Sequence, residues 1–124
     1  MSMITLNQSG IIACRFLLFL ALIVTTYATT AEVTHSAATD VNDKFAHFAS
    51  FFVLSMLADL SFQKRNFDWS VWVTLTAYGL LIEIIQYHIP YRSFSLLDWL
   101  ADSGGVLIYG LSILWIKHLH LIKQ

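Results

Sequence analysis

Four apolar stretches, each close to the length needed to cross a lipid bilayer, account for most of this chain of 124 residues. They lie at about 11–28, 45–62, 69–89 and 96–116, and a spanning helix needs roughly 17–25 residues. Only 12% of the residues are charged, against about a quarter in a soluble domain. The apolar runs are continuous, whereas the strands of a membrane β-barrel alternate apolar and polar residues. Backbone groups inside a bilayer need hydrogen-bond partners within the protein, which a helix provides. The sequence therefore predicts an all-α integral membrane bundle of four transmembrane helices.

The first apolar segment is separated from the others by a polar stretch, from Thr30 to Asp43, that lacks helical periodicity. We therefore expect two parts: residues 1–43, with the first transmembrane helix and an extracytoplasmic linker, and residues 44–124, with the main membrane domain. A cleaved signal peptide is the alternative for the first segment, because small residues at 28–31 follow a short apolar run behind Arg15.

Lysine and arginine predict the orientation, because cytoplasmic loops carry an excess of both. With the N-terminus inside, only Lys44 and Arg92 lie outside, and the inner ends carry the other cations, Arg15, Lys64, Arg65, Lys117 and Lys123. Both termini are therefore predicted to be cytoplasmic. The net charge of −1 and the lack of a long basic run argue against a nucleic-acid partner.

Polar and ionisable residues lie near the predicted outer ends of the last three segments. A charge at the bilayer centre costs about 3 kcal/mol, so such residues indicate a site. At about 1.5 Å per residue, Glu83 and Asp102 lie about 9 Å below the outer ends of their helices. Spacings of three or four residues place each polar pair on one helix face. The sequence thus predicts a layered outer pocket, whose ligand-binding residues are Lys44, His47, Glu83, Gln86, Arg92, Asp98 and Asp102.

Individual roles within this pocket follow from residue chemistry. Glu83 must be paired, protonated or hydrated at that depth, and Arg92, Lys44 and His47 are its expected partners. The planar guanidinium of Arg92 suits a phosphate or carboxylate, either from a ligand or from Asp98 or Glu83. Asp43 is predicted to cap the second helix or to rim the pocket.

The sequence assigns no catalytic nucleophile and no metal. His47, Glu83, Asp98 and Asp102 offer mixed nitrogen and oxygen ligands, but no tight motif such as H-E-x-x-H occurs, and no metal or other cofactor is predicted. Asp59 is expected at the inner interface beside Lys64 and Arg65.

Four short motifs occur in the last three segments: Asp43-Lys44-x-x-His47, Glu83-x-x-Gln86, Arg92-Ser93-Phe94-Ser95-x-x-Asp98, and the pair Gly104-Gly105. In order and spacing they resemble the VanZ-like family of small bacterial membrane proteins, named for a teicoplanin-resistance factor. The resemblance covers roughly residues 43–116. It implies a four-helix module of the cell envelope in the cytoplasmic (inner) membrane, related to antibiotic resistance and without a known reaction. Asp102 departs from the asparagine usual in the family.

Several functions are compatible with these features. The leading hypothesis is an envelope protein, without enzymatic activity, whose outer pocket binds an anionic lipid headgroup or cell-wall precursor held by Arg92 and Lys44. An alternative is a membrane enzyme acting on a lipid-linked phosphate or glycan, with Glu83 or Asp102 as general acid or base and His47 as partner. A proton or ion relay and a structural subunit of an envelope complex are further alternatives, and no oligomeric state is predicted.

Overall fold

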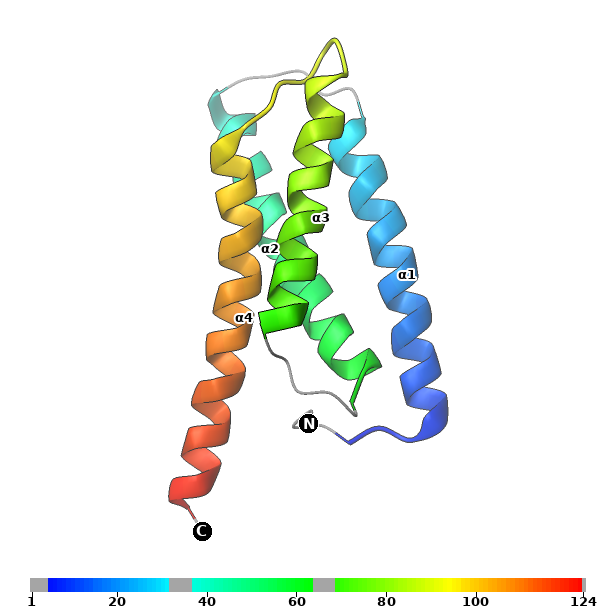
Figure 1. Cartoon of the computed structure of the whole chain (residues 1–124), viewed down its shortest axis with the longest axis vertical. Helices are drawn as coiled ribbons and strands as arrows, with labels where there is room; N and C mark the ends of the chain where they lie inside the picture. Colours follow the sequence, from blue (N-terminus) through cyan, green and yellow to red (C-terminus); the bar gives the residue numbers. More distant parts are fainter. Residues whose placement is uncertain (1–4, 32–36, 64–68, 124) are drawn as a thin grey trace.

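Four helices and their connections make up the part of the chain described by this computed structural model, residues 5–31, 37–63 and 69–123. They are α1 (Gln8–Thr30), α2 (Ala37–Ser61), α3 (Trp69–Tyr87) and α4 (Leu96–Ile122). Successive helices run in opposite directions, so the upper end in Figure 1 gathers the C-terminal ends of α1 and α3 and the N-terminal ends of α2 and α4. Within the described residues there is no strand, so the all-α prediction is confirmed.

Three of the helices, α1, α3 and α4, are long and apolar enough to cross a membrane. Their outward surfaces carry exposed large hydrophobic side chains, such as Phe16, Leu97 and Trp115, as expected where lipid replaces water. The fourth helix, α2, does not meet the same measure of hydropathy. It carries Lys44, His47 and Asp59 along its length, so its crossing of the membrane stays a prediction.

Two helices extend beyond the segments predicted from the sequence. The second helix begins at Ala37, so residues 37–43 of the expected polar linker are helical. Asp43 therefore lies within the helix and does not cap it. The fourth helix continues to Ile122 instead of ending near 116. The extension of α2 has no apolar periodicity that would have marked it.

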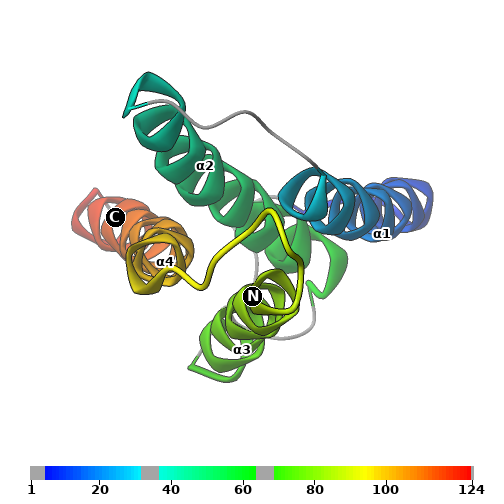
Figure 2. The same cartoon turned by 90° about the horizontal axis from the view of Figure 1, so that it is seen from above.

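The interior is formed mainly where α2 meets its neighbours. Figure 2 shows α1, α3 and α4 arranged around α2. Phe51 and Leu54 of α2, Ile82 of α3 and Val106 of α4 are all buried in this core. Helix α2 packs closely on α4 at Gly105, where an added Cβ would meet the backbone of Phe48. Glycine permits this close approach because it has no side chain.

Candidate functional site

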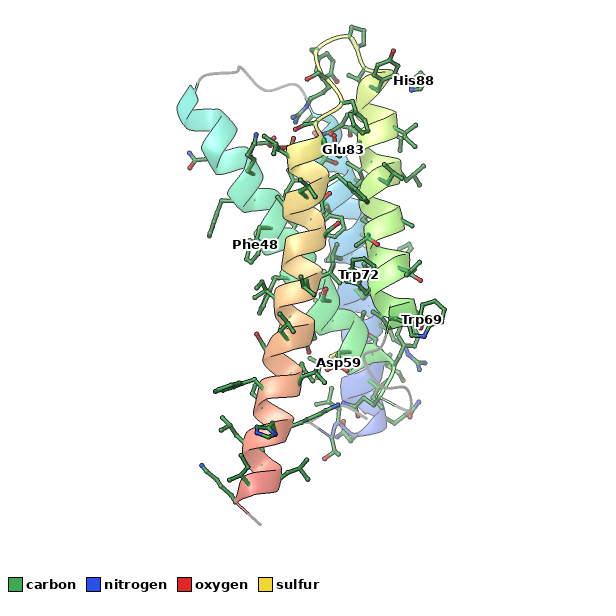
Figure 3. The ribbon with its side chains drawn as sticks, turned by 60° about the vertical axis from the view of Figure 1, so that its left-hand side comes forward. Phe48, Asp59, Trp69, Trp72, Glu83 and His88 are labelled. Atoms are coloured by element: carbon green, nitrogen blue, oxygen red, sulfur yellow. The ribbon has the colours of Figure 1, made fainter. Side chains whose placement is uncertain are left out.

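A group of polar side chains, hereafter the polar cluster, lies at the upper end of the bundle, where α2, α3 and α4 meet. It comprises Asp43, Lys44, His47, Glu83, Asp98 and Asp102. Figure 3 shows Glu83 near this end, with Asp59 toward the other end. The sequence predicted that these six residues come together, and the structure places them side by side.

His47 lies at the centre of the polar cluster and is only 3% exposed. Its Nδ1 is 2.7 Å from Asp102 Oδ1, and with Asp102 as a carboxylate this nitrogen is the donor. The other ring nitrogen, Nε2, lies 3.8 Å from Asp43 Oδ2 and 3.9 Å from Asp98 Oδ2, too far for hydrogen bonds. One histidine thus contacts carboxylates from both its own helix and α4.

The inner part of the polar cluster depends on a close contact between α3 and α4. Asp102 faces Gly79, where an added Cβ would lie 2.8 Å from Asp102 Oδ2. Because a methyl group at Gly79 would overlap this oxygen, the glycine makes room for the carboxylate.

Glu83 is fully buried on α3 and joins the ends of α3 and α4. Its Oε2 accepts a hydrogen bond of 2.9 Å from the backbone N–H of Ser95. Ser95 is the N-cap of α4, and its Oγ accepts a hydrogen bond from the N–H of Asp98. This anchoring role of Ser95 was not predicted from the sequence. Glu83 also lies beside His47 and Asp102, because one carboxylate or imidazole atom of each of these three residues lies within 4.8 Å of the others.

Lys44 supplies the cation of the polar cluster. Its Nζ lies 3.3 Å from Asp98 Oδ1, and its side chain is 40% exposed. It is therefore both paired with a cluster carboxylate and accessible from outside the bundle.

Arg92 and Gln86, in contrast, bind the C-terminal end of α1. The Arg92 guanidinium donates hydrogen bonds to the carbonyls of Ala28 and Ala31, and Gln86 Nε2 donates to the carbonyl of Thr29 at 2.6 Å. These carbonyls have no partner within a helix that ends here, and a cation complements the negative end of the helix dipole. Arg92 was expected to pair with Asp98 or Glu83 or to hold a ligand, but its observed partners are backbone oxygens of α1.

Several buried polar atoms of the site have no hydrogen-bond partner among the residues that the structure describes. They include His47 Nε2, Glu83 Oε1, Gln86 Oε1 and Asp102 Oδ2. A buried polar atom without a partner costs about 1–3 kcal/mol, more when it is charged. The arrangement is therefore incomplete by itself and suits a group that supplies donors or positive charge.

A family model described as VanZ/LLP1 matches residues 8–118. The chain belongs to the VanZ/LLP1 family. The match includes α1, which lies outside the motifs that carry the resemblance. No curated protein and no solved structure matches the chain significantly.

Asp59 of this VanZ/LLP1 protein lies in the lower half of the bundle and is buried, at 5% exposure. Its Oδ2 accepts a hydrogen bond of 2.8 Å from the hydroxyl of Tyr109 on α4. It was expected at the inner interface beside Lys64 and Arg65, which lie outside the described residues, and its observed partner is Tyr109 inside the bundle. Because Tyr109 is 50 positions away, local spacing gave no sign of this pair.

A cavity of about 390 Å³ opens between α1, α2 and α3 of the VanZ/LLP1 bundle. Its lining is mostly apolar, with Leu18, Leu22 and Leu75 among its residues and Asp59 at its edge. No residue of the polar cluster lines it. The side chains of the polar cluster pack against one another instead of enclosing this cavity.

Proposed function

We propose that this VanZ/LLP1 chain is a multi-pass protein of the bacterial cytoplasmic membrane, in which α2 is the fourth crossing and both termini are cytoplasmic. Three apolar helices of sufficient length support the membrane location. The contacts of α2 support its crossing, because its buried polar residues His47, Ser55 and Asp59 lie inside the protein, where charged and polar groups of membrane helices are expected. With this orientation the polar cluster lies at the outer face.

We further propose that the polar cluster binds the polar headgroup of an anionic lipid or lipid-linked cell-wall precursor. The observation that carries this proposal is the set of unpartnered buried acceptors next to Lys44. Hydroxyl or amine groups of a headgroup would donate to Glu83 Oε1. The exposed Lys44 would bind the phosphate, since an ammonium is a common phosphate ligand.

This proposal changes the residue expected to hold the anion. Arg92 is occupied by carbonyls of α1, whereas Lys44 is partly exposed and stands at the polar cluster. A variant of Lys44 is therefore the sharper test of ligand binding. Variants of Arg92 test how firmly the end of α1 is held to the bundle.

Lys44→Gln is expected to lower the amount of lipid that co-purifies with the protein by about tenfold. This is the change in affinity expected when roughly one charge-assisted contact is lost. Lipids extracted from purified wild type and variant are identified and quantified by mass spectrometry. Lys117→Gln is the matched control, because Lys117 is a partly exposed lysine at the opposite end of α4. Equal amounts of lipid in wild type and Lys44→Gln would refute the assignment of Lys44 as the residue that binds the phosphate. A wild type without retained lipid would favour a structural role in an envelope complex.

A second candidate function is hydrolysis or transfer of a lipid-linked phosphate or glycan. The observation in its favour is the 2.7 Å contact that fixes His47 Nδ1 on Asp102, while Nε2 has no hydrogen-bond partner in the described ranges. A histidine held in this way is suited to act as a general base through Nε2.

If the protein is an enzyme, His47→Gln should reduce turnover of a lipid-linked substrate by at least about a hundredfold, the size of a general-base contribution. The assay uses purified protein in detergent with a lipid-linked phosphate, and Asp59→Asn serves as the control because it alters a buried acid away from the polar cluster. Turnover that survives in His47→Gln would exclude the histidine as the base.

A further inference from the structure

We propose that the polar cluster binds one divalent transition-metal ion, with His47 Nε2, an oxygen of Asp43 and an oxygen of Asp98 as ligands. Asp102 orients the imidazole from its other side. No metal was predicted from the sequence, because its ligands follow no compact motif. The structure brings them together from two helices.

The distances around His47 Nε2 suit a shared ion better than hydrogen bonds. Asp43 Oδ2 and Asp98 Oδ2 lie 3.8 and 3.9 Å from this nitrogen, and one ligand atom from each of the three residues lies within 4.8 Å of the others. Ligand atoms that sit about 2.0–2.2 Å from a metal ion are about 3–4 Å from one another. The three residues would therefore need to move little to enclose an ion.

The second, independent observation is the state of His47 itself. The side chain is 2% exposed. Within the described part of the chain Nε2 has no hydrogen-bond partner, although two carboxylate oxygens lie 3.8 and 3.9 Å from it. Its Nδ1 is held by Asp102 Oδ1. A metal-bound histidine typically donates its other ring N–H to a carboxylate, which fixes the ring and makes it a stronger ligand. Asp102 supplies that carboxylate here.

Charge balance favours the same conclusion. The polar cluster contains four carboxyl groups, Asp43, Glu83, Asp98 and Asp102, and one lysine, Lys44. Arg92 does not reduce this imbalance, because its partners are carbonyls of α1. Buried carboxylates that lack a compensating charge are costly, and a divalent cation would offset two of them.

The ligand chemistry narrows the kind of ion. One imidazole with two carboxylates suits Zn²⁺ or Mn²⁺, whereas the absence of a thiolate among the three ligands disfavours copper(I). Asp43 is partly exposed, so the ion would keep an open coordination position on the outer side. That position would accept a phosphate oxygen of a headgroup; this last step rests on the proposed function, but binding of the ion does not.

The experiment measures ion binding to the full-length protein in detergent. Protein is stripped with a chelator, titrated with Zn²⁺ and with Mn²⁺ by calorimetry, and its metal content is determined by mass spectrometry. The wild type is expected to bind one ion per chain. His47→Gln and Asp98→Asn should weaken binding by at least about a hundredfold, and Asp102→Asn by about 10–100-fold, as for other residues that orient a ligand.

Controls separate a lost ligand from a lost fold. Asp59→Asn is the matched control, since it removes a buried carboxyl of the same helix at the other end of the bundle, and it should bind the ion as the wild type does. Helix content and gel-filtration elution of each variant verify the fold. The inference is overturned if the wild type binds no more ion than Asp98→Asn. It is also overturned if Glu83→Gln abolishes binding while Asp43→Asn does not, because the ion would then belong to His47, Glu83 and Asp102.

The same preparations distinguish this inference from the proposed function. Lipid retained equally with and without chelator, in a protein that binds no ion, would support headgroup binding and refute the metal site. Ion binding without any retained lipid would support the metal site and refute headgroup binding. An ion on Nε2 would also occupy the lone pair that the hydrolase candidate needs as its base.

Discussion

Gly105→Ala is expected to destabilise the protein by about 3 kcal/mol, a large cost for adding one methyl group. The added Cβ would overlap the carbonyl oxygen of Phe48 and lie 3.0 Å from the backbone nitrogen of Phe52. Because both contacts are backbone atoms, α2 and α4 would have to separate along the contact that also joins His47 to Asp102. Thermal unfolding in detergent, followed by circular dichroism, measures the loss.

The adjacent glycine provides a matched control. A Cβ on Gly104 would meet only the ring of Phe48, at 3.7 Å, an ordinary van der Waals contact. Gly104→Ala should therefore unfold at the same temperature as the wild type, or slightly higher, because alanine favours a helix by up to about 1 kcal/mol over glycine. Equal melting temperatures for the two alanine variants would contradict the close packing of α2 on α4.

Arg92→Ala is expected to lower stability by about 2–4 kcal/mol and to loosen α1 from the bundle. It removes the hydrogen bonds to the carbonyls of Ala28 and Ala31, and a hydrogen bond that involves a charged group contributes about 1.5–3 kcal/mol. The melting temperature in detergent and the lipid retained per folded molecule are measured together. The melting temperature should fall. The lipid retained per folded molecule should persist at temperatures where the variant remains folded.

The two interpretations of Arg92 predict opposite results. If Arg92 held the anion, as expected from the sequence, Arg92→Ala would keep its melting temperature and lose lipid. Tyr91→Phe serves as a milder comparison, because it removes a single hydrogen bond of 3.0 Å, from the Tyr91 hydroxyl to the carbonyl of Thr30. A smaller loss of stability in Tyr91→Phe than in Arg92→Ala would agree with a binding role of both residues at the end of α1.

Much of the polar cluster is predictable from the sequence because its geometry is local. Asp43 and His47, and likewise Asp98 and Asp102, are four residues apart in a helix, so each pair shares a face. The antiparallel order of the helices then brings these faces to one end of the bundle. The contacts of His47 with Asp43, Asp98 and Asp102 follow from these two facts.

Other partners could not be inferred from the sequence, because they depend on groups that leave no pattern in it. Every residue has a carbonyl, so nothing marks Ala28 and Ala31 as the acceptors for Arg92. The pairing of Asp59 with Tyr109 depends on the relative rotation of α2 and α4, which residue spacing along either helix does not determine. The start of α2 at Ala37 was missed for a different reason, since its first residues are polar and lack an apolar stripe.

Retention of lipid by the purified protein tests the central claim most directly, namely that the polar cluster is a binding site for a polar headgroup. Wild type, Lys44→Gln and Lys117→Gln are purified in the same detergent, and the bound lipid per protein is quantified by mass spectrometry. The account predicts a defined anionic lipid in the wild type and in Lys117→Gln, and about tenfold less in Lys44→Gln. The same amount in all three proteins, or none in the wild type, would contradict it.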